Sequence, residues 1–358
     1  MEKEQFSTVV IGAGQAGLAA GYFLKNIKED FIILEKGHQV GDSWRQRWDS
    51  LRLFTPSQFD GLPGFPFPAI RGTLPTKEKM ADYLFNYSTK FSLPVKLNTK
   101  VIELLKTSEG FEIITSNGRL FSNFVIVATG TNPIAYIPEF AKELDNKIIQ
   151  IHSSEYKNPP GFPALTTLVV GAGISGVEIA IELSKSRTTL LSGRPTPHIP
   201  DFIFRYLGRP YWWFANNVLT LNTPIGRKVR QKILSTGAPL ISVSIDDVKK
   251  AKIEHVPRMK GTLNGLPQLE NDRIVSVDSI VWATGYKPDF SWIKIDLKNN
   301  NGWPETRRGV SENIKGLYFI GMFFQFRLTS GLVGGVGRDT AFVIKHLHKE
   351  KKSLHNSI

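Results

Sequence analysis

The sequence contains no cysteine, and this absence excludes several classes of chemistry. Without a thiol, the chain has no disulfide, no thiolate nucleophile and no cysteine ligand for zinc or an iron–sulfur cluster. Long apolar runs are also missing, since no stretch reaches the roughly 18 to 20 residues that a membrane-spanning helix needs. The first residues carry Glu2 and Glu4 rather than the basic and then apolar layout of a secretion signal. We therefore expect a cytoplasmic protein.

Negative charge is scarce relative to positive charge. Lysine and arginine total 45 against 32 aspartates and glutamates, a net charge of +13, which attracts phosphates, acidic proteins or anionic lipid heads. The basic residues are scattered and no nucleic-acid recognition module is present, so we do not expect nucleic acid as a partner. With 358 residues, 41% of them apolar, the chain is long enough for one large or two medium domains.

Two segments of the chain share one pattern. Residues 9–17 read VVIGAGQAG, a short apolar strand that runs into a glycine-rich turn and a helix, and residues 168–176 read LVVGAGISG. The glycines are Gly12, Gly14 and Gly17 in the first copy and Gly171, Gly173 and Gly176 in the second. Each copy is followed more than 100 residues later by a strand that ends in Ala-Thr-Gly, at Thr129–Gly130 and at Thr284–Gly285. The repeat predicts one architecture used twice.

Glycines at this spacing are typical of a phosphate-binding turn. The first permits a tight turn, the second lets the backbone approach a pyrophosphate, and the third lets the helix pack on the strand. The backbone N–H groups at the helix start then bind the phosphates. One copy alone also fits an ordinary strand-to-helix corner, but two copies in the same context favour nucleotide binding.

The residue that ends the second strand of each copy distinguishes the two nucleotides. Glu35 follows the first copy, and a carboxylate there accepts hydrogen bonds from ribose hydroxyls and repels a 2′-phosphate. Arg194 follows the second copy and suits the 2′-phosphate of NADPH, with Ser192 and Thr196 as additional hydroxyl donors; the alternative is a solvated turn arginine. The economical interpretation is FAD in the first site and NADPH in the second.

These patterns predict an α/β fold of two Rossmann-like, three-layer dinucleotide-binding domains. We expect a discontinuous FAD domain at 1–157 and 288–358, with the NADPH domain at 158–287 between its two parts. A helical aromatic and basic insert is expected at about 200–266, and hinges near the two Ala-Thr-Gly strands.

The carboxy-terminal part is expected to complete the FAD site. The strand at 316–322 ends at Gly321, where the pyrophosphate would cross, and the segment from Ser330 leads into a helix that we expect to end near His348. The positive end of that helix would lie beside the flavin. The alternative for these glycines is a packing turn. The lysines of the tail at 349–352 are interpreted as a solvated end.

Several further motifs resemble one family. The stretch GDSWRQRWDSLRLFTPSQFDGLPGFPFP at 41–68, HSSEY at 152–156 and GVGRD at 335–339 are similar to those of class B flavin-dependent monooxygenases. The chain most resembles the short bacterial branch related to the plant YUCCA enzymes, whose members are often labelled as cation-efflux-associated flavoproteins. The family pattern FxGxxxHxxxY keeps His152 and Tyr156, whereas Asn146 and Ile148 replace its first phenylalanine and glycine.

The resemblance implies which residues line the flavin. It assigns flavin contact to Trp44, Arg45 and Leu53, and it places Phe54 and Thr55 at the reacting edge as the candidate catalytic residues. The alternative for Trp44 and Trp48 is a place in the core. The remaining predicted cofactor contacts, beyond the glycines and Arg194, are Gln15, Glu35, Lys36, Val101, Thr129, Gly130, Ser175, Ser192, Thr284, Gly285, Gly321 and Ser330.

The resemblance also implies the reaction. NADPH would reduce FAD, the reduced flavin would form a C4a-peroxyflavin with O₂, and one oxygen atom would pass to a small sulfide, amine, ketone or keto acid. No metal is expected. An NADPH:ferredoxin or flavodoxin reductase and a non-catalytic flavin and NADP sensor attached to a transporter are the alternatives. The expected partners are the small substrate and O₂, and the expected assembly is a homodimer.

The insert carries the expected substrate determinants. Trp212, Trp213 and Phe214 would wall an apolar pocket, and the basic residues 227–232 follow closely. The same residues suit peripheral contact with a membrane surface. A core-packed helix with a solvated basic face is the third interpretation.

Overall fold

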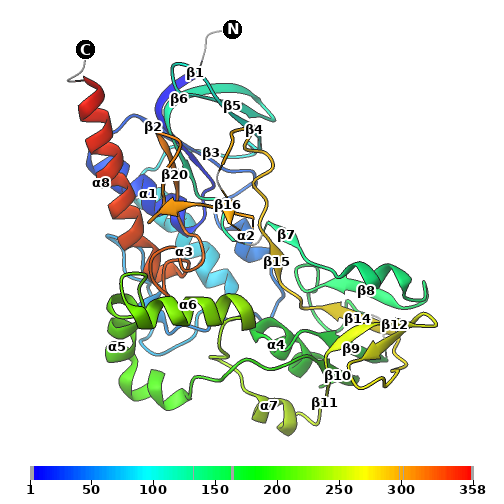
Figure 1. The fold of residues 1–358 in the computed structure, drawn as a ribbon. Coiled ribbons are helices and arrows are strands. Elements are labelled where there is room, and N and C mark those ends of the chain that lie inside the picture. The colour runs from blue at the N-terminus through cyan, green and yellow to red at the C-terminus, as the bar shows by residue number, and fades with distance from the viewer. Residues whose placement is uncertain (1–3, 132, 163–164, 298, 301, 356–358) are drawn as a thin grey trace.

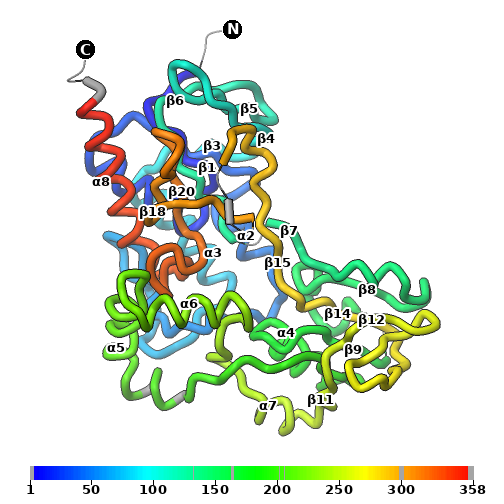
Figure 2. The backbone as a smooth tube through the Cα atoms, in the orientation of Figure 1, coloured from blue at the N-terminus to red at the C-terminus, as the bar shows by residue number. Residues whose placement is uncertain are grey.

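The computed structural model describes residues 4–131, 133–162, 165–297, 299–300 and 302–355. The chain forms two lobes, each built on a parallel sheet (Figure 1). The backbone trace shows the chain entering the second lobe and returning from it along two neighbouring segments (Figure 2). No helix among the described residues is long and apolar enough to cross a membrane.

The first lobe contains a nine-stranded sheet. Its parallel core has the order β20-β6-β1-β2-β3. These strands are β1 (Glu4–Ile11), β2 (Phe31–Leu34), β3 (Val95–Lys96), β6 (Gly118–Val127) and β20 (Leu317–Phe319). The meander β4 (Val101–Lys106) and β5 (Phe111–Thr115) pairs with the first half of β6, on the same side of β6 as β20, and β19 (Val310–Ser311) and β18 (Thr306–Arg307) continue the sheet beyond β20. Strand β2 reads FIIL and is buried throughout, as expected for a parallel strand covered on both faces.

Alternate residues of these strands feed two different cores. Val10 and Ile33 pack with the helices α1 (Gln15–Asn26), α3 (Lys77–Lys90) and α8 (Val336–His355), whereas Val9 and Ile32 pack on the opposite face with β4, β5, the 290–297 segment and Trp303. This division follows from the period of two along a strand.

The second lobe repeats this arrangement. Its five parallel strands have the order β11-β10-β9-β14-β8. They are β8 (Ile149–His152), β9 (Thr166–Val170), β10 (Thr188–Ser192), β11 (Glu254–Val256) and β14 (Ser279–Trp282), with helices α4 (Ile174–Leu183) and α7 (Ile245–Lys250) packed beside them. In both sheets the strand before the glycine turn lies between the next strand and the strand that ends in Ala-Thr-Gly. The predicted fold of two Rossmann-like domains is confirmed.

The two lobes are joined by a short ribbon. Strand β7 (Ile134–Ala135) pairs antiparallel with β15 (Tyr286–Lys287). The predicted boundary at residue 157 therefore lies too late, because β8 already pairs with β14 in the second sheet. The hinges predicted near residues 131 and 286 flank this ribbon, and motion about them stays a prediction.

The insert begins with two helices, α5 (Asp201–Asn217), which is kinked at Leu207, and α6 (Pro224–Thr236). Both lie below the first lobe in Figure 1, although the chain reaches them from the second lobe. Backbone hydrogen bonds from Leu328 N to Leu219 O (3.0 Å) and from Leu221 N to Phe326 O (2.9 Å) hold the insert against the carboxy-terminal segment. The hairpin β12 (Met259–Leu263) and β13 (Leu266–Leu269) follows β11.

The short elements are α2 (Asp42–Arg45), η1 (Ser57–Phe59), η2 (Glu139–Glu143), β16 (Asn299–Asn300), β17 (Trp303–Pro304) and η3 (Val333–Gly335). Helix α8 ends at His355, not near His348, because the tail of lysines and glutamate consists of good helix formers. Lys351 forms an ion pair with Glu29 at 2.9 Å, so the prediction of a solvated tail is wrong at this residue.

Candidate nucleotide and active site

The first glycine turn has a geometry that only glycine allows at two of its positions. Gly12 has a φ of +105°, and a Cβ there would lie 2.7 Å from the Ala128 carbonyl oxygen. A Cβ at Gly17 would lie 1.8 Å from the Gly12 oxygen. A Cβ at Gly14, in contrast, would meet no atom within 4 Å. The middle glycine therefore faces open space at the start of α1.

The second turn repeats these contacts. Gly171 has a φ of +113°, and its Cβ would lie 2.3 Å from the Ala283 oxygen; a Cβ at Gly176 would lie 1.8 Å from the Gly171 oxygen. A Cβ at Gly173 would again meet nothing within 4 Å. In each lobe, the alanine carbonyl of the Ala-Thr-Gly motif therefore packs directly against the first glycine of the turn, which leaves no room for a side chain there.

Both turns fit a pyrophosphate. Gly14 and Gly173 are the N-caps of α1 and α4, and neither provides a side-chain acceptor for the first N–H groups of its helix. Those N–H groups and the positive end of the helix dipole therefore face the open space above the middle glycine. Gln15 and Ser175 stand directly after these caps, at the helix starts.

Glu35 lies beside the first turn. Its carboxylate accepts hydrogen bonds from Ala13 N at 2.7 Å and Gly37 N at 2.9 Å, which fixes its orientation and leaves further lone pairs for ribose hydroxyls. Thr99 N donates to the Glu35 backbone oxygen at 2.8 Å, so the start of β4 at Val101 lies close by. Lys36 is exposed next to this carboxylate.

Arg194 lies at the corresponding place in the second lobe. Its side chain is 79% exposed, and its guanidinium contacts both carboxylate oxygens of Glu270 at 3.2 Å. Ser192 does not join it, because its buried hydroxyl donates to Pro257 O and accepts from Met259 N, both at 2.9 Å. Its predicted contact with a 2′-phosphate is therefore wrong for the side chain. Thr196 is also buried.

The stretch at 41–48 packs against both lobes through its two tryptophans. Trp48 is buried in the core of the second lobe, while Trp44 is half-buried against the core of the first. The Arg45 guanidinium donates to Val40 O and to Asp82, each at 2.9 Å, which holds it toward α3. The stretch therefore links the lobes, and the core interpretation applies to Trp48.

The segment predicted to line the flavin contains a buried acid that the sequence reasoning missed. Leu53 and Thr55 are buried and Phe54 is half-buried. The Thr55 hydroxyl donates to Asp60, a residue that is 1% exposed, and the second carboxylate oxygen of Asp60 has no partner among the described residues. Burial raises the pKa of Asp60 to about 7, against an opposing effect of the Thr55 hydrogen bond. An acid inside the otherwise apolar run FDGLPGF was the available signal.

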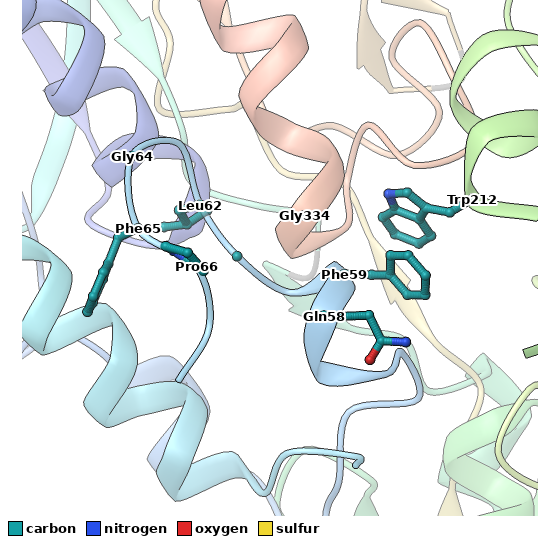
Figure 3. A pocket seen from close by; sticks show the side chains of 9 residues that line it. Gln58, Phe59, Leu62, Gly64, Phe65, Pro66, Trp212 and Gly334 are labelled. Carbon is teal, nitrogen blue, oxygen red and sulfur yellow. The ribbon is translucent and has the colours of Figure 1, made fainter. Parts of the chain in front are cut away.

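Residues on both sides of Asp60 in the sequence line a partly aromatic pocket of about 420 Å³. Its lining consists of Gln58, Phe59, Gly61, Leu62, Gly64, Phe65, Pro66, Trp212 of α5 and Gly334 (Figure 3). Phe59 stacks on Trp212 with ring centroids 4.9 Å apart. Trp213 and Phe214 are instead exposed, 62% and 37%, so only Trp212 of the predicted aromatic wall lines this pocket.

The carboxy-terminal segment is braced by a buried ionic cluster. Asp339 is fully buried and accepts from Arg308 (3.1 Å), Arg327 (3.3 Å) and Ser330 (2.6 Å). Ser330 also accepts from two backbone N–H groups. The hydroxyl of Ser330 is thus buried and engaged within the protein, and its predicted contact with the cofactor stays a prediction. A Cβ at Gly321 would lie 2.7 Å from Ala16 Cβ, which brings the end of β20 close to the start of α1.

The Ala-Thr-Gly ends lie at the junction of the lobes. Thr129, Gly130 and Gly285 are exposed there, and the Thr284 hydroxyl donates to Tyr136 O. His152 is buried, with Nε2 3.0 Å from Gly285 O and Nδ1 3.1 Å from Ser154 N. Burial lowers the pKa of His152. A neutral ring that donates to Gly285 positions the backbone at this junction.

No group of three side chains suited to hold a metal ion occurs among the described residues.

Comparison with known proteins identifies the family. Residues 9–196 match the model of the pyridine nucleotide-disulphide oxidoreductases. An uncharacterized CzcO-like oxidoreductase of Geobacillus kaustophilus is 40% identical over 95% of this chain and 97% of its own length.

Two further relatives are monooxygenases. A probable indole-3-pyruvate monooxygenase of Arabidopsis thaliana, YUCCA8, is 27% identical, over 87% of this chain and 83% of its own. The structure of a flavin-containing monooxygenase from Stenotrophomonas maltophilia superposes with a TM-score of 0.79 at 25% identity, covering 97% of this chain and 99% of the other. The chain therefore belongs to the pyridine nucleotide-disulphide oxidoreductases, and over most of its length it is similar to flavin monooxygenases.

Proposed function

We propose that this enzyme is an NADPH-dependent FAD monooxygenase that transfers one atom of O₂ to a small, neutral organic substrate. The second atom leaves as water, and the two electrons come from NADPH with one proton from solvent. The observation that carries the proposal is the pair of matching glycine turns with opposite charges beside them, Glu35 at one and Arg194 at the other. Bound FAD and NADPH supply the redox chemistry and the activation of O₂.

The chain's own residues bind and orient the two cofactors. The turn at Gly14 would hold the FAD pyrophosphate, with Glu35 on the adenosine ribose. The turn at Gly173 would hold NADPH, with Arg194 on the 2′-phosphate, for which its guanidinium must leave Glu270. The ionic cluster around Asp339 fixes the backbone in front of α8, which we assign to the flavin ring.

The reaction centre is assigned to the segment that contains Phe54 and Thr55. Thr55 is oriented by its hydrogen bond to Asp60, and this pair is shielded from water by burial. A dry, preorganised site protects reactive species from solvent. We assign Phe54 and Thr55 to contact with the flavin edge, and Asp60 to the positioning of Thr55.

The pocket at Phe59 and Trp212 is the proposed substrate site. Its lining is aromatic and aliphatic, and Gln58 provides its one polar side chain among the described lining residues. None of these residues is charged, so the lining favours a neutral sulfide, amine or ketone over a keto acid, whose carboxylate would need a cation from elsewhere. The YUCCA relatives are named for a keto acid substrate, which makes indole-3-pyruvate the informative comparison.

The test is incorporation of labelled oxygen. The purified enzyme would be supplied with NADPH, ¹⁸O₂ and a panel of alkyl and aryl sulfides, tertiary amines, ketones and indole-3-pyruvate. We expect one ¹⁸O atom in the product of a neutral substrate, and a several-fold rise in KM with little change in NADPH binding for Trp212→Ala. NADPH oxidation without label in any product, together with rapid reduction of ferredoxin or flavodoxin, would instead establish a reductase. Absence of any NADPH oxidation would favour the sensor.

A further inference from the structure

The surface of helices α5 and α6 combines exposed aromatic side chains with unbalanced positive charge. On α5, Phe202, Tyr206 and Trp213 are 54%, 74% and 62% exposed. On α6, Lys228, Arg230 and Lys232 are exposed. We name these six residues the aromatic–basic face. The two helices that carry these residues lie below the first lobe (Figure 1).

The exposure of these aromatic residues follows from the way α5 packs. Gly208 and Ala215 are buried and Trp212 is half-buried, a spacing of three to four residues that turns one side of the helix toward the first lobe. Phe202 and Tyr206 precede the kink at Leu207 and Trp213 follows it, and all three side chains are exposed. Neighbouring tryptophans thus have opposite surroundings: Trp212 lines the pocket with Phe59, while Trp213 faces solvent.

The charge of this region is strongly one-sided. From Phe202 to Ile245 the sequence contains six arginines and lysines and no aspartate or glutamate. Nearly half of the net charge of +13 is therefore concentrated in 44 residues of the chain. Elsewhere surface lysines are often balanced by a near acid, as Lys142 is by Glu139 and Lys249 by Asp246.

We propose that the aromatic–basic face docks the enzyme on an anionic lipid membrane. Tryptophan, tyrosine and phenylalanine insert at the boundary between headgroups and acyl chains, while lysine and arginine bind the anionic headgroups. Charge complementarity alone would also suit an acidic protein. The membrane is favoured because the three aromatic residues are exposed and lie outside the lining of the Phe59–Trp212 pocket, whereas the aromatic residues that anchor protein partners are typically packed in pockets.

The inference is independent of the proposed reaction, because it concerns a surface and not the cofactors. The test uses the purified holoenzyme and sedimentation with phosphatidylcholine vesicles that contain 0 or 30% phosphatidylglycerol. We expect binding to the anionic vesicles only, weakened by raised salt. No binding to anionic vesicles at low salt overturns the proposal.

Two matched pairs of variants locate the docking face. The triple variant Lys228→Gln, Arg230→Gln, Lys232→Gln should weaken the partition coefficient by roughly 100-fold. Its control, Lys79→Gln, Lys185→Gln, Lys345→Gln, removes the same charge from exposed positions elsewhere and should change binding less than 3-fold. Equal losses in both triples would show a general effect of net charge and overturn the assignment of the face.

The apolar pair tests insertion. Phe202→Ser with Trp213→Ser should weaken binding at least 10-fold, whereas Ile70→Ser with Leu165→Ser, at positions 81% and 80% exposed, should have no effect. If the basic triple abolishes binding but the Phe202 and Trp213 changes leave it intact, the aromatic residues do not insert. That result would overturn membrane docking in favour of a purely electrostatic surface, such as one for an acidic protein.

Discussion

Replacement of Asp60 by asparagine should change the pH dependence of stability in a defined direction. Burial raises the pKa of Asp60 from 3.8 to about 7. The folded protein therefore keeps the proton between about pH 4 and pH 7, where the unfolded chain has already released it. Since the folded state binds more protons in that window, the free energy of unfolding falls as the pH rises through it.

The magnitude follows from the size of the shift. A shift of about three pKa units corresponds to about 4 kcal/mol, lost at about 1.4 kcal/mol per pH unit. Asparagine does not ionise and escapes this loss, but its amide group leaves a buried donor without an acceptor, at a cost of about 1 to 3 kcal/mol. Asp60→Asn should therefore be less stable than the wild type near pH 4.5 and more stable at pH 8.

Urea-induced unfolding at half-unit steps from pH 4.5 to pH 8 would measure this crossover, with tryptophan fluorescence as the signal and a fixed excess of FAD. The FAD dissociation constant of both proteins must be measured, because ligand binding adds to apparent stability. Burial also raises the pKa of Glu178 to about 7. Because Glu178 is present in both proteins, its contribution to the free energy of unfolding cancels in the difference. A difference between the two proteins that stays constant across the range would refute the reasoning.

Three further predictions concern the nucleotide sites. The Gly14→Ala variant should fold normally, because a Cβ there meets nothing within 4 Å, but it should lose FAD, which its visible spectrum would show. The Gly173→Ala variant should keep FAD and stay yellow, and steady-state kinetics should show a KM for NADPH raised about 10-fold or more. Arg194→Ala should raise the KM for NADPH roughly 10-fold and leave that for NADH nearly unchanged, so equal effects on the two coenzymes would remove the 2′-phosphate assignment. Glu35→Arg should abolish FAD retention, and purification of a fully yellow variant would contradict the ribose assignment.

The sequence predicted the framework because its signals are local and repeated. The glycine spacing and the buried run FIIL each report a backbone requirement within a few residues. The duplicated Ala-Thr-Gly motif also indicated the repeat correctly, because in each lobe the alanine carbonyl of this motif packs against the first glycine of the turn, more than 100 residues away.

The sequence did not predict pairings between distant side chains. Arg194 and Glu270 are 76 residues apart in the sequence, so no local sequence pattern predicts their contact. The hydroxyl of Ser192 was assigned to a phosphate for the same reason: a serine at this place in the sequence suits such a contact, but the fold buries it and engages it in hydrogen bonds with Pro257 and Met259. The boundary at residue 157 failed because the partner of β8 is β14, a strand far along the chain.

The central claim is tested most directly by rapid mixing. The purified yellow enzyme would be reduced anaerobically with NADPH and then mixed with oxygenated buffer in a stopped-flow spectrometer, without substrate. We predict an absorbing species distinct from both oxidised and reduced flavin, which persists for seconds and decays faster when a neutral sulfide or amine is added. Direct return to the oxidised spectrum, at the same rate with and without substrate, would contradict a monooxygenase.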